Sequence, residues 1–96
     1  MRMTVRYHVC LSTIPLGIGE GELLDLSLEG CRLETSMPLP VHTYLGLRII
    51  DTEDELPILI DLAAVRWVQG QECGIQFLAV HAPHGERLRR LLQEPL

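Results

Sequence analysis

Apolar and polar residues alternate along most of the chain, in short segments bounded by glycines or prolines. A period of two places successive side chains on opposite faces of a strand, so each segment predicts a β-strand with one face in a core. Five segments fit this pattern, namely 7–14, 22–28, 31–35, 44–50 and 73–78. The longest apolar stretch, 56–68, predicts a long bent strand from its length and β-branched content, although its residues 62–64, Leu-Ala-Ala, leave a helix as an alternative. Short strands separated by turn signals predict an all-β fold, a small antiparallel barrel or roll.

The end of the chain has a helical period instead. Leu88, Leu91 and Leu92 stand at i, i+3 and i+4, and charged residues surround them. Pro83 suits the first turn of a helix, where its missing N–H costs nothing. We therefore predict a helix over 83–93 that covers the open side or rim of the sheet.

A polar pair interrupts the second predicted strand, in the run from Asp25 to Gly30. Strict alternation places three leucines on the core face and leaves Asp25 and Ser27 on the outer face. A tight hairpin that uses the conformational freedom of Gly30 would pair Ser27 with Arg32 and Asp25 with Glu34. Two carboxylates directly opposite each other repel, so this face favours an incoming cation or hydrogen-bond donor.

Two arginines near the start of the chain, Arg2 and Arg6, are candidates for that cation. Residues 1–6 read as a short flexible arm. Three glycines at 17, 19 and 21 predict a flexible connection before the second strand. They do not predict a phosphate-binding loop, because no GK[ST] follows and the run leads into a strand.

The composition limits the possible partners. A chain of 96 residues makes one domain, and its net charge of −5 argues against binding a nucleic acid polymer. All eight basic residues are arginine, whose flat guanidinium suits bidentate recognition of phosphates and guanine edges. An anionic partner must therefore be small and locally recognised.

The three cysteines, Cys10, Cys31 and Cys73, form no CxxC pair and are interpreted as small core residues in a reducing cytosol. We expect a cytoplasmic protein, with neither a secretory signal nor membrane insertion. His81 and His84 have the spacing of a metal pair but lack a third ligand, so they are interpreted as residues at the start of the helix. The acidic run 51–55 is interpreted as a solvated hairpin tip. No nucleophile, base and orienting group can be assembled, so we expect neither an enzyme nor a cofactor.

Three landmarks, in this order, resemble the PilZ domain, a bacterial family of cyclic di-GMP receptors. Residues 2–6 have the RxxxR pattern, residues 25–30 have the [DN]xSxxG pattern, and 73–77 resemble the late strand of the family. The resemblance covers nearly the whole chain. It implies one domain over 1–96: the arm at 1–6, a six-stranded antiparallel barrel over 7–80, and the helix.

The resemblance also implies a ligand and its contacts. Cyclic di-GMP would be bound by the arginine arm folded over the outer face of the DxSxxG strand. The ligand-binding candidates are Arg2, Arg6, Asp25, Ser27 and Gly30, with Arg32 and Trp67 as further candidates at the border. Many members carry an arginine directly before the first motif arginine, where this chain has Met1, so the sequence leaves open whether one ligand or a stacked pair is held.

The main functional hypothesis is therefore a receptor in which cyclic di-GMP orders the arm and alters a surface seen by a neighbouring domain or partner protein. The alternative is a PilZ-like interaction module that binds no nucleotide and acts through protein contacts in pilus or motility machinery. A barrel that binds single-stranded nucleic acid is disfavoured by the four aromatic residues and the negative charge.

Overall fold

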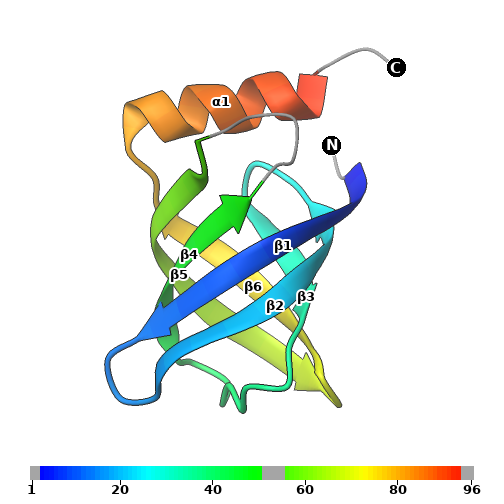
Figure 1. The fold of residues 1–96 in the computed structure, drawn as a ribbon, viewed down its shortest axis with the longest axis vertical. Coiled ribbons are helices and arrows are strands. Elements are labelled where there is room, and N and C mark those ends of the chain that lie inside the picture. Colours follow the sequence, from blue (N-terminus) through cyan, green and yellow to red (C-terminus); the bar gives the residue numbers. More distant parts are fainter. Residues whose placement is uncertain (1–2, 51–55, 94–96) are drawn as a thin grey trace.

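The computed structural model describes residues 3–50 and 56–93, and these form a closed six-stranded barrel with one helix (Figure 1). The elements are β1 (Met3–Thr13), β2 (Gly17–Leu26), β3 (Gly30–Glu34), β4 (Tyr44–Ile50), β5 (Ile58–Gln69), β6 (Glu72–Ala79) and α1 (Ala82–Gln93). All neighbouring strands are antiparallel, in the order β1-β2-β3-β6-β5-β4. The predicted barrel and C-terminal helix are confirmed.

Strand β1 begins earlier than the sequence pattern indicated. Thr4 pairs with Asp25 on β2, and the Val5 side chain is buried in the core. Residues 3–6 therefore belong to the barrel, and the prediction of a separate arm is wrong for them, because burial of Val5 favours the strand. Residues 1 and 2 lie outside the described residues.

Strand β2 also begins earlier, at Gly17, so all three glycines predicted to form a flexible connection belong to it. A Cβ at Gly21 would lie 2.7 Å from the Glu34 carbonyl oxygen, and one at Gly19 would lie 2.5 Å from the Met37 sulfur. These glycines allow close approach of neighbouring segments, which explains their place in a strand.

The core is filled by the inward-facing side chains of all six strands. The most deeply buried include Val9, Leu11, Leu23, Leu26, Leu33, Ile49, Ile60 and Val65. Cys31 and Cys73 are buried among them, as predicted, and burial raises the pKa of the Cys73 thiol to about 11. Cys10 is only half-buried and lies on the outer face of β1, so its interpretation as a core residue is wrong.

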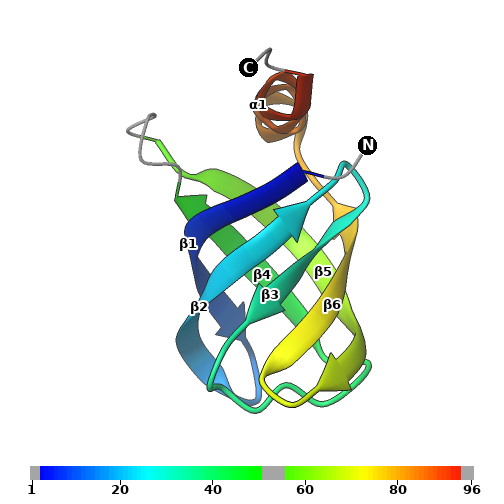
Figure 2. The same ribbon diagram turned by 90° about the vertical axis from the view of Figure 1, so that its right-hand side faces the viewer.

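Helix α1 lies across one end of the barrel (Figures 1 and 2). Leu88 and Leu92 are its buried residues. The His84 Nδ1 accepts a hydrogen bond from the Leu59 N–H, and the backbone N–H of His81 donates to Asp61. A hydrogen bond from the His81 side chain holds the pKa of the Asp61 carboxyl below its usual range.

His81 and His84 thus form hydrogen bonds with β5, which agrees with their interpretation as residues at the start of the helix. Within the described residues, no helix is both long and apolar enough to span a bilayer.

The close approach at Gly21 predicts a stability difference between two alanine substitutions. Gly21→Ala forces a methyl group against the β3 backbone and should lower the free energy of unfolding by about 1–3 kcal/mol. Gly85→Ala in α1 meets only Val80 at 4.0 Å and should leave stability unchanged or raise it by up to about 1 kcal/mol. Urea unfolding of both variants measures the difference, and equal stabilities would contradict the packing described for β2.

Candidate functional site

The turn between β2 and β3 is built by Ser27. Its hydroxyl donates to the Gly30 carbonyl at 3.1 Å and accepts from the N–H groups of Glu29 and Gly30 at 3.3 and 3.2 Å. The Glu29 carbonyl accepts a bond from the Phe77 N–H on β6. Ser27 is buried, so its hydroxyl closes the turn and does not lie on an open outer face as predicted.

Asp25 lies opposite Arg32, because the β2–β3 register shifts between Leu23 and Asp25. One carboxylate oxygen accepts from the Arg32 backbone N–H at 3.2 Å, and the other accepts from Arg32 Nε at 3.0 Å. The predicted pairing of Asp25 with Glu34 and Ser27 with Arg32 is therefore wrong. The extra residue Leu24 is a β-bulge, which alternation alone cannot show.

The bulge also changes which leucines are buried. Leu23 and Leu26 lie in the core, whereas Leu28 is exposed. Asp25 is buried, with its charge balanced by Arg32, which in turn reaches Glu72 on β6 with its Nη1 at 3.0 Å. Arg32 is thus fixed between two carboxylates and remains 40% exposed at its side chain.

Gly30 is required by strand packing. A Cβ at this position would lie 2.1 Å from the carbonyl oxygen of Ile75 on the neighbouring strand β6. Among the described residues, the glycines with a positive φ are Gly17 and Gly70. The expectation that Gly30 uses a glycine-only conformation is therefore wrong, and the missing side chain is what matters.

Trp67 lies over Gly74 on the adjacent strand β6. A Cβ on Gly74 would meet the indole nitrogen at 2.0 Å, so the ring covers the glycine backbone while 42% of the residue stays exposed. A register shift between Val65 and Trp67 brings the successive residues Arg66 and Trp67 both to the surface. Arg66 Nε donates to Gln76 Oε1 at 2.5 Å.

These residues border one surface cleft of about 170 Å³, which we name the β3–β5–β6 cleft. Its lining residues are Ser27, Glu29, Gly30, Cys31, Arg32, Arg66, Trp67, Gly74, Ile75 and Gln76. Four of the predicted candidates, Ser27, Gly30, Arg32 and Trp67, therefore meet at one place. Two arginines and an indole beside it can bind a phosphate and the face of a base.

Arg6 lies apart from this cleft. Its guanidinium donates to Glu22 Oε1 at 2.6 Å, and this hydrogen bond raises the pKa of Arg6. Arg6 borders a second cleft of about 530 Å³ with His8, Glu20, Glu22 and Glu34. In the part of the chain that the structure describes, the two clefts share no lining residue. The remaining candidate, Arg2, lies outside the described residues.

Sequence reasoning missed two members of the site. Glu72, which binds Arg32, stands outside the motifs, and only the β3–β6 register brings it close. Arg66 directly precedes the candidate Trp67 in the sequence. Strict alternation, however, predicts that one of these two side chains points into the core. The bulge that exposes both has no signal in the local pattern.

The described residues form a small antiparallel barrel with a surface cleft that is bordered by two arginines and a tryptophan. The sequence profile of the PilZ domain matches residues 2–94, and the chain belongs to the PilZ family. PilZ domains in general bind cyclic di-GMP and act as binding modules. Among curated protein sequences, none shows significant similarity to this chain.

Two solved structures show the same fold. The PilZ domain of CeSA from a cellulose-synthesizing bacterium superposes with a TM-score of 0.75 at 17% identity, over 95% of this chain and 93% of that one. The Bacillus subtilis inhibitor of motility, MotI/DgrA, superposes with a TM-score of 0.73 at 16% identity. That match covers 98% of this chain and 51% of the other, so this chain spans about half the length of MotI/DgrA.

The buried pair predicts unequal effects for two carboxylates on β2. Asp25→Ala removes two hydrogen bonds and leaves the Arg32 N–H without its acceptor, which should cost about 1–3 kcal/mol of unfolding free energy. Glu22→Ala breaks an ion pair whose side chains are 73% and 43% exposed, and it should cost less than about 1 kcal/mol. Chemical denaturation compares them, and an equal or larger loss for Glu22→Ala would contradict the structural role of Asp25.

Proposed function

We propose that this PilZ domain is a receptor for cyclic di-GMP and that the β3–β5–β6 cleft holds part of the ligand. The observation that supports this best is the meeting of Arg32 from β3 with Arg66 and Trp67 from β5 at one cleft. Cyclic di-GMP offers two phosphates and two guanines, which match guanidinium groups and an aromatic face. The cleft therefore has the chemistry that the ligand class of the family requires.

Trp67 is suited to hold a guanine by stacking. Its ring is supported from below by the Gly74 backbone, so its orientation is limited while one face remains open to solvent. Arg66, beside it, can bind a phosphate or a guanine edge after releasing Gln76. Stacking and a charge-assisted bond would thus act on the same nucleotide.

The motif residues Asp25, Ser27 and Gly30 would then act mainly by shaping the site. Asp25 orients Arg32, Ser27 closes the turn beside it, and Gly30 permits close packing of β3 on β6. Asp25 is also a proposed acceptor for guanine N–H groups when Arg32 turns toward a phosphate. If Arg32 exchanged Asp25 for a phosphate, the Asp25 carboxylate would become available to the guanine.

Arg6 can join the ligand from the other side of β2. It stands between Thr4 and Tyr7, which pair with Asp25 and Leu23, so it lies at nearly the same level as Arg32. Adjacent strands are about 4.8 Å apart, which places the two backbones about 10 Å apart across β2. Long arginine side chains at that separation can bind the same two-phosphate ligand, with Arg2 added from the preceding residues.

The signal would arise when Arg6 leaves Glu22 and the start of β1 changes its contacts. A partner protein or neighbouring domain would detect that change. The hairpin between β1 and β2 offers a candidate docking surface, because Ile14, Leu16 and Ile18 are exposed there at 100%, 42% and 85%. The same surface would serve the alternative function, a nucleotide-independent interaction module.

Calorimetric titration with cyclic di-GMP tests the receptor function, with GTP as the specificity control. Wild-type protein should bind, and Arg66→Ala, Trp67→Ala or Arg6→Ala should each weaken binding by about one to two decades, the effect of losing one charge-assisted or stacking contact. Arg48→Ala is the matched control, because Arg48 lies exposed on β4, opposite β3 in the barrel order. Trp67 is the single tryptophan, so its fluorescence should change on binding.

Two results would contradict parts of this proposal. Absence of binding by folded wild-type protein would favour the interaction module. Binding that is insensitive to Arg66→Ala and Trp67→Ala would place the ligand elsewhere on the barrel. The molar ratio would show whether one ligand or a stacked pair is held.

A further inference from the structure

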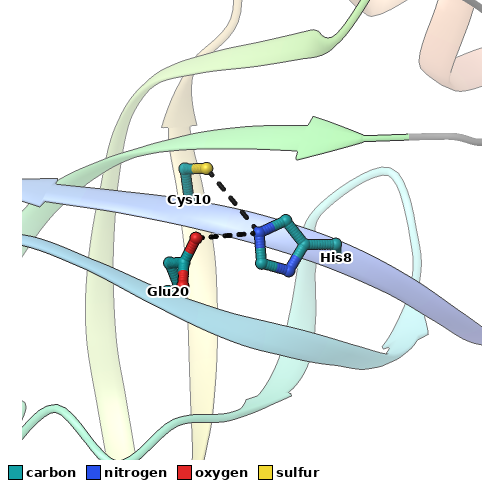
Figure 3. Close-up of side chains that lie close together, drawn as sticks. All are labelled: His8, Cys10 and Glu20. Atoms are coloured by element: carbon teal, nitrogen blue, oxygen red, sulfur yellow. Dashed lines mark hydrogen bonds and ion pairs between the residues drawn. The ribbon is translucent and has the colours of Figure 1, made fainter.

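Three side chains with metal-binding atoms meet on the outer surface of β1 and β2, away from the β3–β5–β6 cleft. His8 and Cys10 stand two residues apart on β1 and so share its outer face, and Glu20 is the Cα partner of Cys10 on β2. Figure 3 shows the His8 ring, the Cys10 sulfur and the Glu20 carboxylate pointing toward one another. Their ligand atoms all lie within 4.8 Å of one another.

The distances suit a tetrahedral metal ion. His8 Nε2 lies 3.3 Å from Glu20 Oε1 and 3.9 Å from Cys10 Sγ. With the usual Zn–N, Zn–O and Zn–S bond lengths, a tetrahedral zinc ion separates these atom pairs by about 3.4 Å and about 3.6 Å. The third pair, Cys10 Sγ and the Glu20 carboxylate, lies within 4.8 Å, so rotation of the Cys10 side chain would bring the three atoms toward one face of the tetrahedron.

The backbone beneath these side chains is rigid. β1 is hydrogen-bonded to β2 on one side and to β4 on the other, and Cys10 pairs with Glu20 and with Arg48. Two of the three ligands therefore sit on a strand held from both sides. Such preorganisation lowers the cost of ordering the ligands when a metal binds.

The surrounding charge also favours a cation. His8 and Glu20 border the second cleft together with Glu22, Glu34 and Arg6. The cleft is thus lined by three carboxylates and one guanidinium, that of Arg6, which already forms an ion pair with Glu22. The exposed Arg48 on β4 is the opposing charge on the other side of Cys10.

We propose that His8 Nε2, Cys10 Sγ and a Glu20 carboxylate oxygen bind a zinc-type divalent metal ion, with water as the fourth ligand. One thiolate, one imidazole and one carboxylate form a mixed set that zinc accepts and that magnesium and calcium do not prefer. Binding releases the Cys10 thiol proton to solvent, and the three protein atoms replace water molecules of the hydrated ion. This metal site is separate from the proposed nucleotide site, and it uses none of the residues that line the β3–β5–β6 cleft.

Cobalt(II) is the probe of choice, because a tetrahedral cobalt–thiolate site has a near-ultraviolet charge-transfer band and intense visible bands. Tag-free reduced protein should bind one cobalt ion per chain with these bands, and zinc should displace it. Cys10→Ser should abolish the charge-transfer band, and His8→Gln or Glu20→Gln should weaken binding at least about tenfold. All three positions are on the outer surface, and circular dichroism verifies that each variant is folded.

Two matched controls separate this site from other histidines and carboxylates. Glu86→Gln changes an exposed carboxylate on α1, and His81→Gln removes an exposed histidine that lies beside Asp61. Both should bind cobalt within about threefold of wild type. The proposal is overturned if wild-type protein gives no charge-transfer band, if the band survives Cys10→Ser, or if His81→Gln abolishes it.

A second measurement does not depend on cobalt. Zinc should slow alkylation of Cys10 in the folded wild-type protein, because a coordinated sulfur is no longer available to the reagent. Cys31 and Cys73 are buried, so Cys10 is the thiol that this assay reports. Unchanged alkylation at a zinc concentration that displaces cobalt would also overturn the proposal.

Discussion

The β-bulge at Leu24 is the constraint on which the site depends. It inserts one residue into β2, and every side chain after it changes its partner on β3. Without the extra residue, the register of Glu22 and Leu23 would pair Asp25 with Cys31; with it, Asp25 meets Arg32 and Leu26 enters the core. A burial that would be costly for an isolated carboxylate becomes acceptable, since two hydrogen bonds from Arg32 balance its charge. Of these two hydrogen bonds, the one from Arg32 Nε to Asp25 holds the Arg32 guanidinium beside the cleft.

The arginines differ in how firmly they are held, and this difference decides what a ligand could move. Arg32 is bound by both Asp25 and Glu72 and is partly buried between them. Arg6 has one partner among the described residues for which a contact is given, and its side chain is 73% exposed. Because solvent screens an exposed ion pair, it contributes little to stability, and an anion would take Arg6 from Glu22 at little cost. A ligand would therefore displace the start of β1 more easily than the β3–β6 side of the site.

The sequence was sufficient for the features that follow a regular period. Alternation located the core residues Val9 and Leu11, the strand Tyr44–Ile50 and, with the motif order, the whole barrel. It failed at the register shifts next to Leu24 and Arg66, because one inserted residue reverses the faces without altering composition. The interior position of Asp25 was missed for that reason, and that of Ser27 because its hydroxyl closes the turn after β2. Contacts such as Arg32 with Glu72 depend on strand order, which no local pattern contains.

The carboxylates along β2 explain how a chain with a net charge of −5 holds two of its arginines at defined positions. Glu20, Glu22 and Asp25 follow one another along this strand, and each faces a different cationic group or metal-binding side chain on a neighbouring strand. Glu22 and Asp25 hold Arg6 and Arg32, one on each side of β2. These carboxylates hold the two guanidinium groups in place without a ligand, and in the proposed receptor they would become acceptors when the arginines turn toward a phosphate. Glu20 has no arginine contact among the described ion pairs; its nearest partner is His8, beside the Cys10 thiol. In our two proposals, Glu20 would bind a cation from solution, whereas Glu22 and Asp25 would orient the arginines that bind an anion.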